Sequence, residues 1–244
     1  MPEDKAGVSS SSTGRNLRYL VSHSTYLAAI GKIPDTLPTH KRTFMKGHDL
    51  IHEGQRGQNA YLLRDGWACS YRILHDGTRQ IINFHIPGDL VGIRRLITFA
   101  SDDNLCAITR MEAEEISVDD LSIALRGNSC LAMSILWSAF RDEAIVTQHL
   151  IDVGRRHPIN RAAHLFLELG SRLNLAGLGT KTAFECPLTQ SLVADALSLT
   201  TVHFNRVLRQ LRELNAMTFH DGRVAFLDSR KLEHLADFDS SYLR

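Results

Sequence analysis

The sequence predicts an α+β protein: an antiparallel β-roll of the jelly-roll kind, then one long helix, then a compact helical unit that contains a β-hairpin. Three observations carry this prediction. Short β-prone runs separated by glycines recur about every ten residues between 41 and 117, as in a small antiparallel roll. A stretch with almost no helix breakers and with helical apolar periodicity follows over 119–154. Two capped helical segments and a hairpin signal then lie between 186 and 227.

Length and composition bound the function classes. The 244 residues, 43% of them hydrophobic, leave room for two domains that each bury a core. The formal net charge of +1 gives no overall attraction to nucleic acid, so any nucleic-acid-binding patch must be local. No apolar run is long enough to span a membrane, and the N-terminus lacks the apolar core of a signal peptide. We therefore expect a cytoplasmic protein without a membrane partner.

The sequence contains no motif for catalysis or metal binding. It has no P-loop, nucleophile elbow or paired-carboxylate motif, so we expect no enzyme activity. The 12 histidines show no ligand spacing and the 4 cysteines form no CxxC pair, so we expect neither a metal nor another cofactor. Cys186 is predicted to be a small core residue, with an oxidisable switch as the alternative.

The N-terminal part of the chain holds a leader and the β-roll. Residues 1–16 are Ser-rich and nearly free of apolar side chains, which predicts a disordered leader. Apolar periodicity over 17–30 predicts one or two short helices, and the β-roll domain is expected over 17–118. Asp65-Gly66 and Asp76-Gly77 predict hairpin turns within the roll, because Asp-Gly is favoured where a turn needs positive φ.

A single long helix is predicted over 119–154, and the segment 154–158, which contains Gly154 and Pro158, breaks it and forms a hinge. The apolar stripe of this helix is too long to be buried wholly against the β-roll. We predict that its distal half packs against the same helix of a second subunit, as in a short parallel coiled coil. An internal core helix is the alternative. The residues expected at this homodimer interface are Leu136, Phe140, Ala144, Thr147 and Ile151.

The C-terminal domain, expected over 155–244, contains two helices joined by a tight turn. Thr189 is a suitable N-cap for a first helix over about 190–197, and Thr200 for a second that ends near Leu214. Ser198 occupies the turn between them, where a positive φ would cost a serine about 1 kcal/mol.

Further elements are predicted around this helix pair. An amphipathic helix is expected over 160–175, and a glycine-containing loop over 174–185 follows it. Residues 217–227 predict a β-hairpin around Asp221-Gly222, which would form the wing of a winged helix-turn-helix. A short helix over 229–236 closes the domain.

The exposed face of the second helix suits the major groove of DNA. Arg206 lies one turn from the helix start, where a guanidinium can bond O6 and N7 of one guanine. The residues expected to read bases are Thr201, Val202, Asn205 and Arg206. Those expected to contact phosphates are Gln190, Thr200, His203 and Arg209. An ordinary surface helix with solvated arginines is the alternative.

Several short motifs occur in the order of a known family. They are Glu53-Gly54-Gln55 with Gly57, Tyr61-Leu62-Leu63 with Gly66, Tyr71-Arg72, Asp76-Gly77 with Arg79-Gln80-Ile81, Phe84, Pro87-Gly88-Asp89-Leu90 with Gly92, and Leu188-Thr189-Gln190 through Asn205-Arg206. In this order the chain resembles the Crp/Fnr superfamily of bacterial transcription regulators. The resemblance implies a cyclic-nucleotide-binding-like β-roll as sensory domain, a dimerisation helix and a winged helix-turn-helix. It also implies a homodimer on a roughly palindromic site in double-stranded DNA, RNA polymerase as a partner and a small-molecule effector.

The β-roll departs from the nucleotide-binding members of this family. Those members close a phosphate cassette with a Gly-Glu pair and an Arg further along, where this chain has Gly92-Ile93 and Asp103. Since an aspartate here would repel a phosphodiester, cyclic AMP is not expected to bind. A candidate effector pocket would instead use Gly88, Asp89, Arg94 and Arg95. No cysteine precedes Cys69, so an iron–sulfur cluster on N-terminal cysteines is not expected.

The sequence therefore predicts a dimeric, sequence-specific DNA-binding transcription regulator whose effector is unknown. The alternative is a sensory β-roll module that acts through protein–protein contact and carries a degenerate helix-turn-helix.

Overall fold

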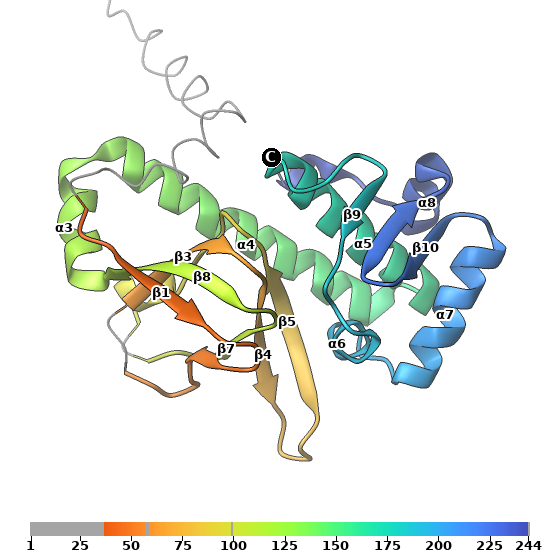
Figure 1. Cartoon of the computed structure of the whole chain (residues 1–244), viewed down its shortest axis with the longest axis horizontal. Coiled ribbons are helices and arrows are strands. Elements are labelled where there is room, and N and C mark those ends of the chain that lie inside the picture. The colour runs from red at the N-terminus through yellow and green to blue at the C-terminus, as the bar shows by residue number, and fades with distance from the viewer. Residues whose placement is uncertain (1–36, 57–58, 99, 244) are drawn as a thin grey trace, which may run out of the picture.

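The computed structural model describes residues 37–56, 59–98 and 100–243. The predicted leader over 1–16 and the predicted helices over 17–30 lie outside this range. Figure 1 shows a β-roll on one side, a helical domain on the other and the long helix α4 running between them. Among the described residues, no helix is long and apolar enough to cross a membrane.

The β-roll consists of two four-stranded antiparallel sheets. The first has the order β1 (His40–Phe44), β8 (Met111–Ser117), β3 (Asn59–Asp65) and β6 (Leu90–Val91). The second has the order β2 (Asp49–Ile51), β7 (Asn104–Ala107), β4 (Ala68–Ile73) and β5 (Arg79–His85). Inward side chains such as Leu63, Leu105 and Met111 form a core within the roll. The prediction of a roll over this part of the chain is confirmed.

Of the two predicted hairpin turns, one is confirmed and one is wrong. Strands β4 and β5 pair across Asp76-Gly77, with Ile73 opposite Arg79. Strands β3 and β4 on either side of Asp65-Gly66 lie in different sheets, so that turn carries the chain from one sheet to the other. Gly66 has φ 79°, and a Cβ there would collide with the backbone of Arg110. The glycine signal was correct, but a turn signal does not reveal which strands pair.

The prediction of one continuous helix over 119–154 is also wrong. The structure has α3 (Val118–Gly127) and α4 (Ser129–Arg155), separated at Asn128. Asn128 has extended backbone angles, and its side chain accepts a hydrogen bond of 3.0 Å from the backbone N–H of Leu131. Asparagine after glycine is therefore an N-cap for a new helix, because its side chain competes with the helix for backbone donors.

The C-terminal domain contains four helices and a small sheet among the described residues. The helices are α5 (Pro158–Leu175), α6 (Gln190–Ala196), α7 (Thr201–Glu213) and α8 (Ser229–Ala236). The sheet has the order β10 (Met217–His220), β11 (Arg223–Phe226) and β9 (Ala183–Glu185). Strand β9 falls in the predicted loop, because three residues are too few to show strand periodicity. The predicted wing hairpin and closing helix are confirmed.

The two halves of the molecule share one apolar core. A single cluster of buried side chains extends from Ile81 and Phe84 of the roll to Phe166, Phe204 and Leu211 of the C-terminal domain. Strand β5 contacts both α4 and α6, so the second sheet of the roll is the surface against which the C-terminal helices pack. The 3₁₀ helix η1 (Ile93–Leu96) contacts α3 and β3, and the 3₁₀ helix η2 (Ser240–Leu243) contacts α4 and α5.

Candidate nucleic-acid interface and the junction behind it

Helix α7 begins and packs as its sequence predicts. The Thr200 hydroxyl oxygen accepts a hydrogen bond of 3.2 Å from the His203 N–H, and Thr189 caps α6 in the same way. Phe204 and Leu211 are fully buried against the domain core. One face of α7 is therefore fixed by apolar packing, and the opposite face remains in solvent.

The four predicted base-reading residues share the exposed face of α7. Thr201, Val202, Asn205 and Arg206 are all exposed, and Val202 has 65% of its surface in solvent. Within the described part of the chain, the Arg206 guanidinium has no hydrogen bond or ion pair that would hold it to the protein. An unengaged guanidinium beside an exposed valine can present bidentate donors and a methyl surface to base edges.

The four predicted phosphate-contacting residues lie at the rim of this face. Gln190, Thr200, His203 and Arg209 are exposed, the first two at the starts of α6 and α7. The Arg209 Nε donates to the Glu213 carboxylate at 2.7 Å, and this ion pair partly neutralises the positive charge of Arg209. Arg223, which begins strand β11 in the wing, is also exposed and was not among the predicted residues. Its hairpin position was the signal that could have identified it.

The turn between α6 and α7 is bonded to the β-roll. Ser198 has φ 53°, as its place in the turn predicted, and its hydroxyl donates to the Gln80 side chain at 2.8 Å. Beside it, Arg79 donates to the Asp195 carboxylate through Nε at 2.9 Å and Nη2 at 2.6 Å. The β4–β5 hairpin therefore supports the strained turn of the helix-turn-helix.

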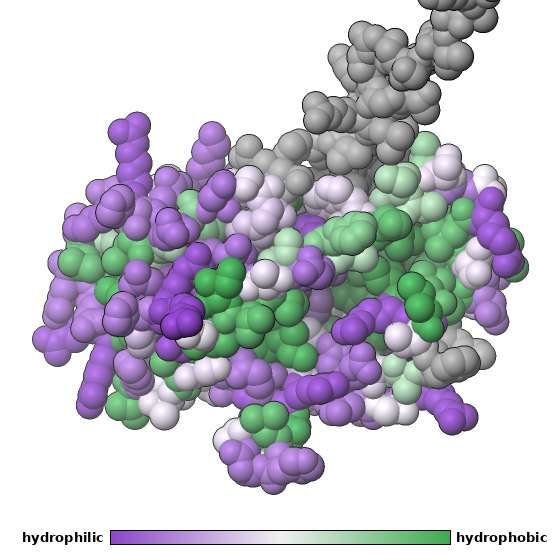
Figure 2. Space-filling view, turned by 180° about the vertical axis from the view of Figure 1, so that it is seen from behind, coloured by the Kyte–Doolittle hydropathy of each residue, from purple (hydrophilic) through white to green (hydrophobic). Residues whose placement is uncertain are grey.

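The distal part of α4 exposes an apolar seam. Leu131 and Ile135 pack against the roll, but Phe140 and Leu150 have 67% and 68% of their surface in solvent. Exposed residues recur along α4 with alternating steps of three and four: Met133, Leu136, Phe140, Glu143, Thr147 and Leu150. We call this set the α4 seam. Figure 2 shows hydrophobic side chains gathered on the back of the molecule, opposite the view of Figure 1.

The seam includes three of the predicted interface residues and lies beside the other two. Leu136, Phe140 and Thr147 belong to it, whereas Ala144 and Ile151 are one position away. Met133 and Leu150 belong to the seam but were not among the predicted interface residues, because the predicted stripe had helical rather than coiled-coil spacing.

Three residues of the candidate effector pocket have different surroundings. The Asp89 carboxylate is buried between Arg141, at 2.7 Å, and Arg172, at 2.8 Å. Arg94 is 72% exposed at its side chain and pairs with Asp102 at 3.2 Å. The Asp89 carboxylate is therefore engaged by two arginines at the junction between the roll and the C-terminal domain, and it is not free to bind an effector.

Of these residues, Arg95 is the one with guanidinium nitrogens available to bind an anion. It is 9% exposed, and its Nη1 donates a long 3.5 Å hydrogen bond to the Asn59 carbonyl. Its Nε and Nη2 are buried without a hydrogen-bond partner. These two atoms form one edge of the guanidinium, the edge that binds carboxylates and phosphates bidentately.

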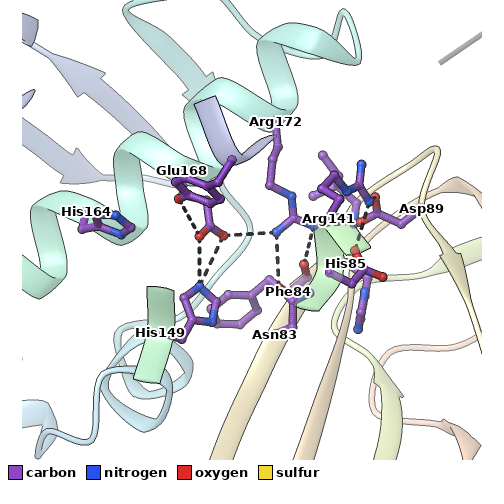
Figure 3. Close-up of polar contacts among 12 residues, drawn as sticks. Asn83, Phe84, His85, Asp89, Arg141, His149, His164, Glu168 and Arg172 are labelled. Carbon is purple, nitrogen blue, oxygen red and sulfur yellow. Dashed lines mark hydrogen bonds and ion pairs between the residues drawn. The ribbon is translucent and has the colours of Figure 1, made fainter. Parts of the chain in front are cut away.

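A buried ionic network joins the roll, α4 and α5 (Figure 3). Arg172 of α5 donates to the Asp89 carboxylate and to the Phe84 carbonyl, both at 2.8 Å. Glu168 lies one turn earlier on α5 and accepts from Arg172 at 3.3 Å and from the His149 Nε2 at 3.1 Å. The other ring nitrogen of His149 lies 3.0 Å from the Ile82 carbonyl oxygen.

For Glu168 and His149, charge pairing within the network shifts the pKa more than desolvation does. Burial pushes the pKa of Glu168 up, but His149 and Arg172 lower it to about 2. Burial likewise disfavours protonation of His149, yet the charge and hydrogen bond of Glu168 leave its pKa raised. His85 differs, because burial lowers its pKa to about 4 despite the nearby Asp89. The network therefore favours the charged form of His149 and the neutral form of His85.

The described residues contain no group of histidines, cysteines and carboxylates that could hold a metal ion. Cys186 is fully buried, and burial raises the pKa of its thiol to about 12. Because its thiol stays protonated and inaccessible, Cys186 has the properties of a structural core residue.

Comparisons with known proteins agree with the fold and with the helix-turn-helix. Residues 41–128 match the cyclic nucleotide-binding domain family, and residues 160–235 match the Crp-like helix-turn-helix domain family. Nitrogen fixation regulation protein FixK of Rhizobium meliloti (strain 1021) is 26% identical over 212 residues, which cover 84% of this chain and 90% of that protein. Transcriptional activatory protein AadR of Rhodopseudomonas palustris is 27% identical over 194 residues, 77% of each chain.

Solved structures show the same architecture. FixK2 from Bradyrhizobium japonicum matches with a TM-score of 0.74 at 22% identity, over 82% of this chain and 98% of that chain. A CRP-family transcriptional regulator from Thermus thermophilus matches with a TM-score of 0.64 at 19% identity, over 81% and 97%. With the exposed face of α7 and two matched domains in the family order, the chain belongs to the Crp/Fnr superfamily and is a DNA-binding transcription regulator of that type.

Proposed function

We propose that two copies of this chain pair along the α4 seam and that each inserts α7 into one half of a palindromic DNA site. The exposed polar face of α7, centred on the unengaged Arg206, is the observation that carries the proposal. As a regulator of transcription, such a dimer is expected to contact RNA polymerase when bound at a promoter.

Each base-reading residue has a distinct chemical preference. Arg206 can donate to O6 and N7 of one guanine, and Asn205 can bond adenine or a phosphate. Val202 cannot accept a hydrogen bond, but its methyl groups can contact the methyl group of thymine. A half-site should therefore contain a fixed G·C pair with a T·A preference beside it.

The dimer part of the proposal rests on the spacing of the α4 seam. Alternating steps of three and four residues keep the seam on one line along a supercoiled helix pair. Phe140 and Leu150 would be buried in such a pair, and burying a large apolar side chain contributes about 1.5–3 kcal/mol. A second copy of α4 offers a matching surface, because a two-fold interface brings identical patches together.

The effector of the roll is proposed to be an anion other than cyclic AMP. Asp103 stands where the phosphate-binding arginine would be needed, and Ile93 begins η1. Arg95 is the group that an anionic effector would meet, through Nε and Nη2. Calorimetric titration with cyclic AMP is expected to give no signal at millimolar concentration. A signal that disappears in Arg95→Gln would show that the roll takes the nucleotide in an unforeseen pose.

Selection of random DNA duplexes tests the proposed function. The protein should enrich two inverted half-sites about one helical turn apart. Affinity for the selected site should fall steeply between two salt concentrations, because phosphate contacts release counterions. If the selected pool shows no inverted repeat and binding is weak at both salt concentrations, the alternative of a protein-contact module is correct.

A further inference from the structure

The C-terminal segment Phe238–Leu243, which we call the strap, crosses back over the junction between α4 and α5. We propose that Tyr242 in this strap is a positioning residue: it fixes the DNA-binding domain against α4 and thereby sets the spacing between half-sites that the dimer accepts. The proposal rests on the proposed dimeric DNA reading and adds a residue that governs its geometry.

The path of the strap is set at the end of α8. Asp237 has φ 48°, and the Phe238 N–H donates to the Glu233 carbonyl at 3.0 Å, which closes the helix and reverses the chain. The strap then forms η2, which contacts both α4 and α5. Leu243 at its end is buried, so the strap is packed into the structure instead of trailing in solvent.

Aromatic rings hold the strap on α5. The Tyr242 ring lies parallel to the His164 ring, with centroids 6.1 Å apart, and Phe238 meets both rings edge-on. Such ring pairs add specific geometry to apolar burial. The strap therefore has a defined place on the helix.

The Tyr242 hydroxyl completes the coordination of the buried Glu168. It donates to Oε2 at 3.1 Å, where the His149 Nε2 also approaches, and Arg172 donates to the other oxygen. One carboxylate thus gathers a group from α4, a group from α5 and a group from the strap. Burial and the charge of Glu168 raise the pKa of Tyr242, so the hydroxyl stays a donor across the working range of pH.

The position of the Glu168 carboxylate explains why the strap would control the spacing between DNA half-sites. The α4 seam fixes the two subunits to each other, while α5 and α7 move together because Phe166 and Phe204 share one core. Only two residues, Arg156 and His157, link α4 to α5 along the chain. The angle between these helices therefore decides the distance between the two copies of α7, the recognition helix, in a dimer.

The strap lies outside both matched family domains. The helix-turn-helix match ends at residue 235, before Phe238. The family match therefore does not supply the contacts of Tyr242.

The experiment compares four proteins on two kinds of DNA. The proteins are the wild type, Tyr242→Phe, a variant that lacks residues 238–244, and the control Ser241→Ala, which changes an exposed strap hydroxyl. Each is titrated onto a duplex with one selected half-site and onto full sites whose spacer is shortened or lengthened by single base pairs. Sedimentation first confirms that all four remain dimers.

Tyr242→Phe and the truncated variant should keep the wild-type affinity for the single half-site. Their gain in affinity from the second half-site should fall by about tenfold, because a loosened domain lowers the effective concentration of the second recognition helix. Their preference for one spacer length should also broaden, with the larger change in the truncated variant. Ser241→Ala should match the wild type in all three measurements.

Two results would overturn the positioning role. One is an unchanged spacer preference in the truncated variant. The other is an equal loss on half-sites and full sites, which would mean that the strap only stabilises the fold. If the wild type itself selects no half-site, the proposed function fails first and the positioning role fails with it.

Discussion

At the scale of single residues, Arg206 is the side chain on which base recognition depends. Its guanidinium is exposed and unengaged among the described residues, one turn into a helix whose start is capped by Thr200. Replacement by alanine should cost about 1–3 kcal/mol of binding free energy and relax the preference at one position per half-site. Arg206→Lys is the control, because it keeps the charge but loses the bidentate fork. Selection that returns the wild-type motif with Arg206→Ala would show that another residue reads this base.

Val202 allows a change of specificity rather than a loss of it. The side chain is exposed on the same face, where its methyl groups should favour T·A. Val202→Glu introduces an acceptor for the N4 amino group of cytosine, so preference at the neighbouring position should move to C·G. Sequencing of the selected duplexes measures the shift. An unchanged motif would place Val202 outside the groove.

The cysteines should separate into one reactive and three protected thiols. Burial raises the pKa of Cys69 and Cys186 to about 12 and that of Cys106 to about 11, whereas Cys130 is exposed. Because the thiolate is the reacting form, alkylation of the native protein should modify Cys130 first. Peptide mass spectrometry after timed exposure to iodoacetamide gives the order. Modification of Cys186 as fast as Cys130 would revive the oxidisable-switch alternative.

At the scale of elements, α4 packs against the roll with one part and is proposed to pack against the partner subunit with another. Its N-terminal part buries Leu131 and Ile135, and its distal part exposes the α4 seam. The combined change Phe140→Glu and Leu150→Glu should produce monomers, since it places charges where two helices would bury apolar side chains. Sedimentation measures the oligomeric state, and binding to the selected full site should be lost in parallel.

A matched control exists elsewhere on the surface. Ile97 and Ile123 are exposed large hydrophobic residues outside α4, so the combined change Ile97→Glu and Ile123→Glu adds the same charge. This control should remain a dimer. If the seam variant also remains a dimer, the two subunits meet through a different surface.

At the scale of the whole molecule, the ionic network makes stability depend on pH in two directions. The pKa of Glu168 is lowered from its ordinary value of 4.5 to about 2, so its contribution is present above 4.5 and is lost as pH falls towards 2. That contribution is on the order of 3 kcal/mol. His85, buried neutral with a pKa of about 4, adds to the acid loss, because the unfolded chain binds its proton from 6.5 downwards.

His149 is responsible for the loss of stability at alkaline pH. Its pKa is raised above 6.5, so its contribution is present below 6.5 and is lost as pH rises through the raised value. The free energy of unfolding, from denaturant titrations across pH, should therefore decline as pH rises above 6.5 and through the raised pKa of His149. In His149→Gln this decline should disappear. The acid loss should become smaller but persist, because Arg172 still lowers the pKa of Glu168 after His149 is removed. An alkaline decline of the same size in His149→Gln would assign it to another group.

The sequence by itself determined the order of the elements and the face of α7. Thr189 and Thr200 are caps wherever a helix begins after them, and the apolar stripe of Phe204, Val207 and Leu211 must face a core. These are local rules, and they place Arg206 and Val202 in solvent without reference to the rest of the chain. The boundaries of α6 and α7 therefore agree with the structure to within a residue or two.

Tertiary structure alone decided the contacts between distant parts of the chain. Asp89 was predicted to line an effector pocket, but Arg141 and Arg172 come from helices far along the sequence and occupy its carboxylate. Tyr242 gave no signal at all, because a lone tyrosine near a chain end has no period or spacing. The meeting of Tyr242 with Glu168 depends on how α5 lies against α4, and no pattern within either segment encodes that angle.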